Sequence, residues 1–137
     1  MSLRDEANQI LSMLDDTINA ALAGPITEIA KNDIQFRVES DVYPLYTPTL
    51  YQRRGRSGGI ADTSMYEASV DDATHTLTVR DDRPEVGIVE SGTGYTWEES
   101  AIYHMQPFPR PYFDLAEEDV VLDGEAETAL IDAITRI

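Results

Sequence analysis

The sequence predicts an α+β fold, with an N-terminal amphipathic helix and a C-terminal helix packed on a small antiparallel sheet. Two changes in the spacing of apolar residues carry this prediction. The spacing is helical up to residue 23, alternates in the middle of the chain, and becomes helical again after Asp123. A chain of 137 residues has room for one modest core, so we expect a single domain over residues 1–137.

The first helix is predicted over residues 3–23. Ser2 and Asp5 fit a capping box at its start. Gly24-Pro25 is expected to end this helix, and Pro25 to open a short second helical segment through Lys31. The apolar residues of the first helix recur at intervals of three and four, at Leu3, Ala7, Ile10, Leu11, Leu14, Ile18, Ala21 and Leu22.

Alternation predicts the sheet that follows. Ile34, Phe36 and Val38 alternate with polar residues and predict a half-buried strand over 34–39. Residues 64–70 and 75–80 are predicted to form a β-hairpin. After Asp123 a last helix is predicted, with one apolar face made of Ala126, Leu130, Ala133, Ile134 and Ile137.

The charge is strongly negative and of an unusual kind. The net charge is −16, the bases are nine Arg and one Lys, and Asp outnumbers Glu by 14 to 12. Such a surface keeps its hydration in concentrated salt, where the self-repulsion is screened. The composition resembles that of haloarchaeal proteins, and an ordinary acidic protein with few lysines is the alternative. Residues 67–137 carry net −13, against −3 for residues 1–66.

Composition also argues against several classes of protein. The acidic balance argues against binding a nucleic-acid backbone as the main activity. There is no cysteine for a disulfide, a thiol nucleophile or a metal site. The acidic first residues are unlike a signal peptide, and no apolar run is long enough to cross a bilayer. We therefore expect no membrane association.

No pattern indicates catalysis. His75 and His104 have no metal-ligand spacing and are predicted to be structural or surface residues. The Gly-rich stretch 90–94 lacks the frame of a phosphate-binding loop and is predicted to be a turn. Asp71-Asp72 and Asp81-Asp82 lack the spacing of a calcium loop. We predict no enzyme activity, no cofactor and no metal.

The segment 40–63 is predicted to be an extended interaction loop. It holds a basic cluster in an acidic chain, next to tyrosines and prolines, and these residue types are enriched in binding hot spots. A solvated loop is the alternative. The interface residues predicted in this segment are Tyr43, Tyr46, Tyr51, Arg53, Arg54 and Arg56.

Several motifs resemble phage virion proteins. Residues 89–93 (VESGT), followed by residues 106–113 (QPFPRPYF) and a helix, resemble the tail-component, or head–tail joining, family of long-tailed phages. Residues 43–60 resemble a Tyr-x-Pro, Arg-Arg and Gly-Gly signature of related virion proteins. From these motifs Glu90 and Arg110 join the predicted interface. The spacing of the prolines and the extreme acidity depart from the family pattern.

The resemblance implies a small structural subunit that forms an oligomeric ring at the neck of a virion. Such a ring would join the capsid connector to the tail and let double-stranded DNA pass without specific binding. Its partners would be further copies of the chain and other neck, connector and tail proteins, assembled in the host cytoplasm. The acidic composition indicates a haloarchaeal tailed virus. Two alternatives remain open: a tail-terminator ring subunit, and an acidic DNA mimic that binds a nucleic-acid-binding protein.

Overall fold

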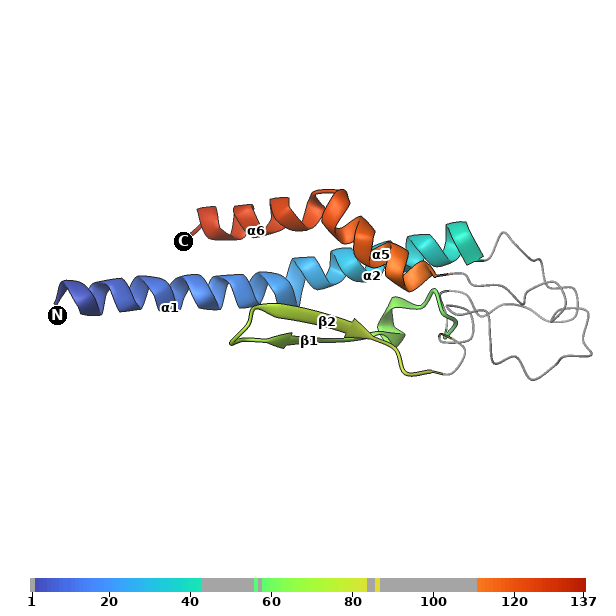
Figure 1. The fold of residues 1–137 in the computed structure, drawn as a ribbon, viewed down its shortest axis with the longest axis horizontal. Helices are drawn as coiled ribbons and strands as arrows, with labels where there is room; N and C mark the ends of the chain where they lie inside the picture. Colours follow the sequence, from blue (N-terminus) through green and yellow to red (C-terminus); the bar gives the residue numbers. More distant parts are fainter. Residues whose placement is uncertain (1, 43–55, 57, 84–85, 87–110) are drawn as a thin grey trace, which may run out of the picture.

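The computed structural model describes residues 2–42, 56, 58–83, 86 and 111–137, and these form an elongated α+β fold (Figure 1). One long helical rod runs from Leu3 to Val42. A two-stranded hairpin lies along one side of the rod, and the C-terminal helix lies along the other (Figure 1). The predicted fold class is confirmed.

The rod begins with α1 (Leu3–Ala21), and its N-terminus has the predicted capping box. The Asp5 amide donates to the Ser2 hydroxyl over 3.2 Å, and the Ser2 amide donates to the Asp5 carboxylate over 3.0 Å. Residues 2–13 are all exposed, and only Ala21 of α1 is fully buried. The stability of the first three turns therefore comes from helix propensity and capping rather than from packing within the chain.

Gly24-Pro25 does not end the helix, contrary to the prediction. Residues Leu22–Ile26 form a π-helical turn (η1) that contains Pro25, and α2 (Thr27–Arg37) continues the rod. A π turn shifts the hydrogen-bonding register by one residue, so a proline without an N–H donor can be accommodated. The Thr27 hydroxyl donates to the Leu22 carbonyl over 2.6 Å and bridges this turn.

The predicted strand 34–39 is wrong, because these residues are helical. They belong to α2 and to a second π turn, η2 (Val38–Val42). Phe36, which the strand would have buried, is 63% exposed. The decisive pattern is a stripe of buried apolar residues spaced by four, at Ile26, Ala30, Ile34, Val38 and Val42.

The hairpin is confirmed with slightly shifted ends. β1 (Glu67–Asp71) pairs antiparallel with β2 (Thr76–Arg80), and Val70 lies opposite Leu77. A short 3-10 turn, η4 (Thr63–Met65), leads into β1. The strands pack on η1, and β2 also packs on α2. In the described part of the chain the sheet has these two strands only.

Two helices end the chain. α6 (Glu125–Thr135) is the predicted last helix, and it runs along α1. α5 (Tyr112–Leu122) was not predicted, and it packs against α2. Gly124, with φ +77°, forms the bend between them.

The core is small and lies where α2, η2 and α5 meet the start of the hairpin. Tyr112 and Val38 have the largest fully buried side chains of the described residues. The other core members are Ile34, Val42, Ile60, Ala61, Tyr66, Val86 and Ala116. The core therefore lies at the end of the rod away from the N-terminus, beside the start and end of the segment 43–57.

Candidate interaction site

The predicted interface residues fall largely outside the described part of the chain. Arg56 is described, and so are the residues that precede and follow the segment 43–57. The predicted residues outside the described part are Tyr43, Tyr46, Tyr51, Arg53, Arg54, Glu90 and Arg110.

Arg56 pairs with a residue of its own chain. Its Nη2 lies 2.7 Å from Glu39 Oε1 and its Nε lies 3.1 Å from Oε2, so the two groups meet in a fork. The pairing lowers the pKa of the Glu39 carboxyl and raises the pKa of the Arg56 guanidinium. The Arg56 side chain is 66% exposed, so the pair contributes little to stability. It connects the end of the rod to the beginning of the turn that follows Arg56.

That turn, Gly58–Ala61, has backbone geometry that depends on its glycine. Gly58 has φ +89°, a conformation that residues with a Cβ rarely adopt. Its amide donates to Asp62 Oδ2 over 2.7 Å. The other Asp62 oxygen accepts from the amide and hydroxyl of Ser64, and these hydrogen bonds lower the pKa of the Asp62 carboxyl.

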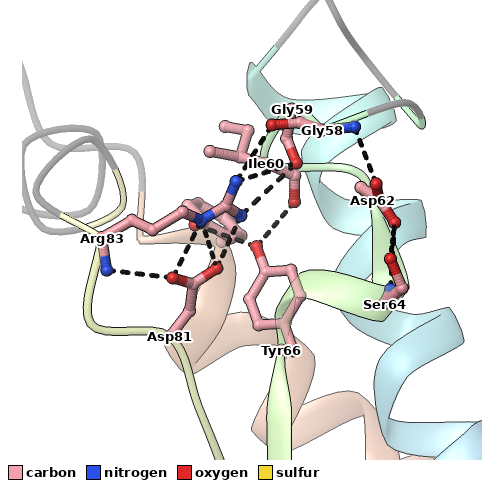
Figure 2. Close-up of polar contacts among 9 residues, drawn as sticks. Gly58, Gly59, Ile60, Asp62, Ser64, Tyr66, Asp81 and Arg83 are labelled. Atoms are coloured by element: carbon pink, nitrogen blue, oxygen red, sulfur yellow. Dashed lines mark hydrogen bonds and ion pairs between the residues drawn. The ribbon is translucent and has the colours of Figure 1, made fainter.

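A buried ion pair holds the same turn from the end of β2 (Figure 2). Arg83 Nη2 lies 2.6 Å from Asp81 Oδ2, and Nε lies 2.9 Å from both carboxylate oxygens. Arg83 Nη1 donates to the Gly58 carbonyl over 3.1 Å and to the Gly59 carbonyl over 3.4 Å. The guanidinium therefore joins a buried carboxylate to two backbone carbonyls, the geometry for which Arg is better suited than Lys.

Two tyrosines complete the arrangement. The Tyr66 hydroxyl donates to the Ile60 carbonyl over 2.6 Å and lies 3.2 Å from the Tyr112 hydroxyl. The Arg83 guanidinium lies 6.0 Å from the Tyr66 ring centroid. From α2, Gln35 donates to the Ala61 carbonyl over 2.8 Å.

We call the group Asp62, Tyr66, Asp81 and Arg83, together with the turn Gly58–Ala61, the turn clamp. Its contacts come from the residues that follow β2, from the residues around η4, from α2 and from α5. The chain leaves the rod at buried Val42 and returns at the turn clamp. The described residues at both ends of the segment 43–57 therefore belong to, or lie beside, the buried core of the described part of the chain.

A second polar cluster joins α2 to α5. The Arg37 guanidinium donates to both oxygens of Asp119 over 2.6 and 2.8 Å, and to Asp41 over 2.9 Å. The pKa of the Asp119 carboxyl is lowered by this pairing. The bidentate pair fixes α5 on the long rod.

Comparison of the chain with models of known protein families identifies its family. The YomN family model matches residues 6–136, which is nearly all of the sequence. The chain belongs to the YomN family. This family is of phage type, which confirms the phage part of the resemblance but not the tail-component family or a haloarchaeal source. Neither a curated protein nor a solved structure matches the chain.

Next to the Arg37 cluster, this YomN chain has an acidic group with a shifted pKa. Asp33 Oδ2 is buried and has no hydrogen-bond partner within the described residues. Burial, with Asp123, Asp119 and Glu125 nearby, raises the pKa of Asp33 to about 7. Within the described ranges no group of acidic or histidine side chains has an arrangement that could hold a metal ion.

The other sequence motifs have structural roles where the YomN chain is described. His75 Nδ1 lies 2.8 Å from Asn19 Oδ1, and its Nε2 lies 3.2 Å from Asp15 Oδ1. This histidine therefore connects the hairpin turn to α1. Asp71 caps the hairpin turn by accepting from the Ala73 and Thr74 amides. His104 and residues 90–94 lie outside the described part. No described helix is long and apolar enough to span a membrane.

Sequence reasoning missed the turn clamp. In the sequence Asp81-Asp82 suggests only a cation ligand, whereas Asp81 pairs with Arg83 two residues later. Gly58-Gly59 stands out only as part of a motif. The usable signal was an Asp-x-Arg directly after a strand, together with a Gly-Gly turn. However, their contact joins residues 24 and 25 positions apart, which local patterns do not reveal.

Proposed function

We propose that this chain is a structural subunit of the head–tail connection of a tailed virus. In this role it forms an oligomeric ring at the neck or the top of the tail, joins the capsid connector to the tail and lets DNA pass. The acidic composition favours a haloarchaeal tailed virus, and the location is the virion after assembly in the host cytoplasm. A tail-terminator ring is the neighbouring role within the same particle.

The observation that carries the proposal is the anchoring of the segment 43–57 at both ends. Val42 is 4% exposed, and the Gly58–Ala61 turn is fixed by the turn clamp. The sequence between these anchors contains Arg53 and Arg54 near tyrosines, which are the residue types of interaction hot spots. A rigid base under such a segment lowers the entropy cost of docking it on a neighbouring protein.

The charge supports passage of DNA rather than binding of it. The described surface of β1, α5 and α6 is acidic, and residues 67–137 carry net −13. An acidic surface repels phosphates and would let a duplex slide past. The same charge would suit a DNA mimic, but a decoy needs no anchored Arg/Tyr segment.

The test is a pair of double variants in the virus that encodes the chain. Arg53→Ser with Arg54→Ser removes two charges from the segment but leaves the Arg56–Glu39 pair intact. Arg80→Ser with Arg136→Ser removes two exposed charges elsewhere and serves as the matched control. We expect the first variant to leave filled capsids and free tails unjoined, and the control to give infectious particles.

Three results would contradict the proposal. If the Arg53/Arg54 variant gave normal particles, the segment would be a solvated loop and not an interface. Absence of the chain from the necks of purified wild-type particles, judged by labelling and electron microscopy, would remove the structural role. Displacement of DNA from a DNA-binding protein by the purified chain would favour the DNA mimic.

A further inference from the structure

The first three turns of α1 present an apolar stripe that no described residue covers. Leu3, Ile10 and Leu11 are 83%, 65% and 57% exposed. Further along the same stripe, Leu14 and Ile18 are half-buried where α6 runs along α1. Figure 1 shows α1 extending past the C-terminus of α6. We call residues 3–11 the α1 tip.

A groove with apolar walls lies elsewhere on the same chain, between the rod, β2 and α5. Its volume is about 460 Å³. A water-sized group occupies ~30 Å³, so the groove can take several aliphatic side chains. On its lip Val121 is 76% exposed. Its apolar walls include Ile26, Ala30, Leu77, Val79, Phe113 and Val121.

The α1 tip cannot reach the groove of its own chain. The α1 tip and one wall of the groove belong to the same rod. Leu11 lies eleven residues before Leu22, the first groove residue on the rod. At 1.5 Å per residue this separation is about 17 Å along a continuous helix. Any contact between the two surfaces must therefore join different copies.

We propose that the α1 tip of one copy packs into this groove of a neighbouring copy. The contact is head-to-tail, because it uses two different surfaces of the same chain. A contact of this kind closes into a ring when its rotation closes, and otherwise gives a filament. This inference deepens the proposed ring function and rests on it for its biological setting.

Charge at the two surfaces favours a second copy as the occupant. Arg4 is the only base among the first 30 residues, and it stands two helical turns before Leu11 on the same side of the helix. The positive end of the α1 dipole lies beside it. Asp114, Glu117 and Glu118 line a hollow next to the groove, and Glu117 lines both.

The acids of the first α1 turn do not cancel this complementarity. The Asp5 carboxylate accepts hydrogen bonds from Ser2 at its own helix end. By helical geometry, Glu6 lies at the edge of the stripe away from Arg4. Docking would therefore place the basic edge of the tip beside the acidic mouth of the groove.

The test uses the purified chain in molar KCl, where self-repulsion is screened. The tip variant is Ile10→Glu with Leu11→Glu, and the groove variant is Thr78→Glu with Val121→Glu. All four residues are exposed, so both variants should fold. Matched controls place two glutamates on the polar face of α1 (Gln9→Glu with Ser12→Glu) or at exposed apolar residues outside the groove (Phe36→Glu with Met65→Glu).

Sedimentation velocity and light scattering report the association. We expect wild type and both controls to assemble with rising concentration, and each of the two test variants to associate at least about tenfold more weakly. A mixture of tip and groove variants retains one intact contact, so it should give a discrete two-chain complex.

Three outcomes would overturn the proposal: a wild type that stays monomeric, a mixture that stays monomeric, or a groove variant that assembles like wild type. If a glutamate variant does not fold, a mixture of Leu11→Cys and Val121→Cys chains tests the contact instead. Because the chain has no cysteine, a disulfide between copies would support the contact and its absence would refute it. A monomeric wild type would contradict this contact but not the proposed location at the neck. Absence of the chain from necks would contradict that location but not a contact measured with the purified chain.

Discussion

The Arg83 guanidinium lies 2.6 Å from the Asp81 carboxylate, and only 2% of the Asp81 side chain is exposed. The same guanidinium donates to the carbonyls of Gly58 and Gly59. One side chain therefore neutralises a buried charge and fixes the turn that follows the Arg/Tyr segment. The geometry of the turn at the end of the segment 43–57 therefore depends on the ion pair between Asp81 and Arg83, which are two residues apart in the sequence.

Replacing Arg83 with Met should destabilise the fold by about 3 kcal/mol, because the buried Asp81 carboxylate loses its ion pair and keeps only the hydrogen bond from the backbone amide of residue 83. Adding Asp81→Asn should recover part of the loss by removing that charge. The control is Arg80→Met, since Arg80 is 64% exposed and lies 3.6–3.7 Å from its partners. It should cost less than about 0.5 kcal/mol in urea denaturation. Equal losses for Arg83→Met and Arg80→Met would show that the turn clamp does not stabilise the domain.

Two glycine substitutions should have opposite effects. Gly58→Ala should lower the free energy of unfolding by roughly 1–2 kcal/mol, because at φ +89° the alanine Cβ clashes with backbone atoms of its own residue. Gly24→Ala should stabilise by about 0.5–1 kcal/mol, because the position is helical and an added Cβ meets nothing within 4 Å. Thermal unfolding of both variants beside wild type measures the difference. A stabilising Gly58→Ala would contradict the left-handed turn.

The helical ends of the fold could be predicted because their periodicity is local. The α1 stripe, the capping box and the last helix all appear within short windows of sequence. The middle of the rod could not be predicted, because a strand-like and a helical spacing of apolar residues overlap there. Ile34, Phe36 and Val38 alternate like a strand, whereas the buried stripe through Val42 is spaced by four. Long-range packing of α2 on α5 decided between the two.

The candidate site was predictable in part, for a similar reason. The Arg/Tyr segment stands out by composition, so it could be singled out from sequence alone. The turn clamp could not, because its members are ordinary residues that acquire their role by meeting in space. Tyr66 and Tyr112, for example, lie 46 residues apart, yet their hydroxyls are 3.2 Å apart in the core.

Asp33 should make stability depend on pH between about 4 and 7. Its pKa rises from 3.8 to about 7 in the folded chain, first because of burial and then because of Asp123. The folded state therefore holds a proton that the unfolded state releases, and this group's contribution falls as the pH rises through that window. Above about 7 the loss is complete and constant.

Asp33→Asn should accordingly stabilise the domain at pH 8, by roughly 1–2 kcal/mol after allowance for solvent screening, and should have little effect at pH 4. The difference between variant and wild type isolates this group from Asp119 and Asp62, whose lowered pKa values act in the opposite direction. Asp132→Asn, an exposed carboxylate on α6, is the control. A difference that does not change with pH would contradict the assignment to Asp33.

Salt should stabilise the domain. The net charge of −16 is concentrated in residues 67–137, which carry −13, so the second half of the chain is the main source of the repulsion. At about 0.1 M salt the screening length is ~10 Å, and at 1 M it is ~3 Å, so adding KCl weakens this repulsion. We expect the melting midpoint to rise steadily from about 0.1 M to 3 M KCl. If it did not change, the interpretation of the acidic composition as halophilic would be wrong.

A charge-reduced variant separates screening from other effects of concentrated salt. Exposed glutamates of α5 and α6 can be changed to glutamine at Glu117, Glu118, Glu125 and Glu127. If repulsion causes the salt dependence, this variant should melt higher than wild type at 0.1 M KCl and should gain less on going to 3 M. If instead salt acts by strengthening burial of apolar surface, both proteins should gain equally, because the substitutions leave the core unchanged.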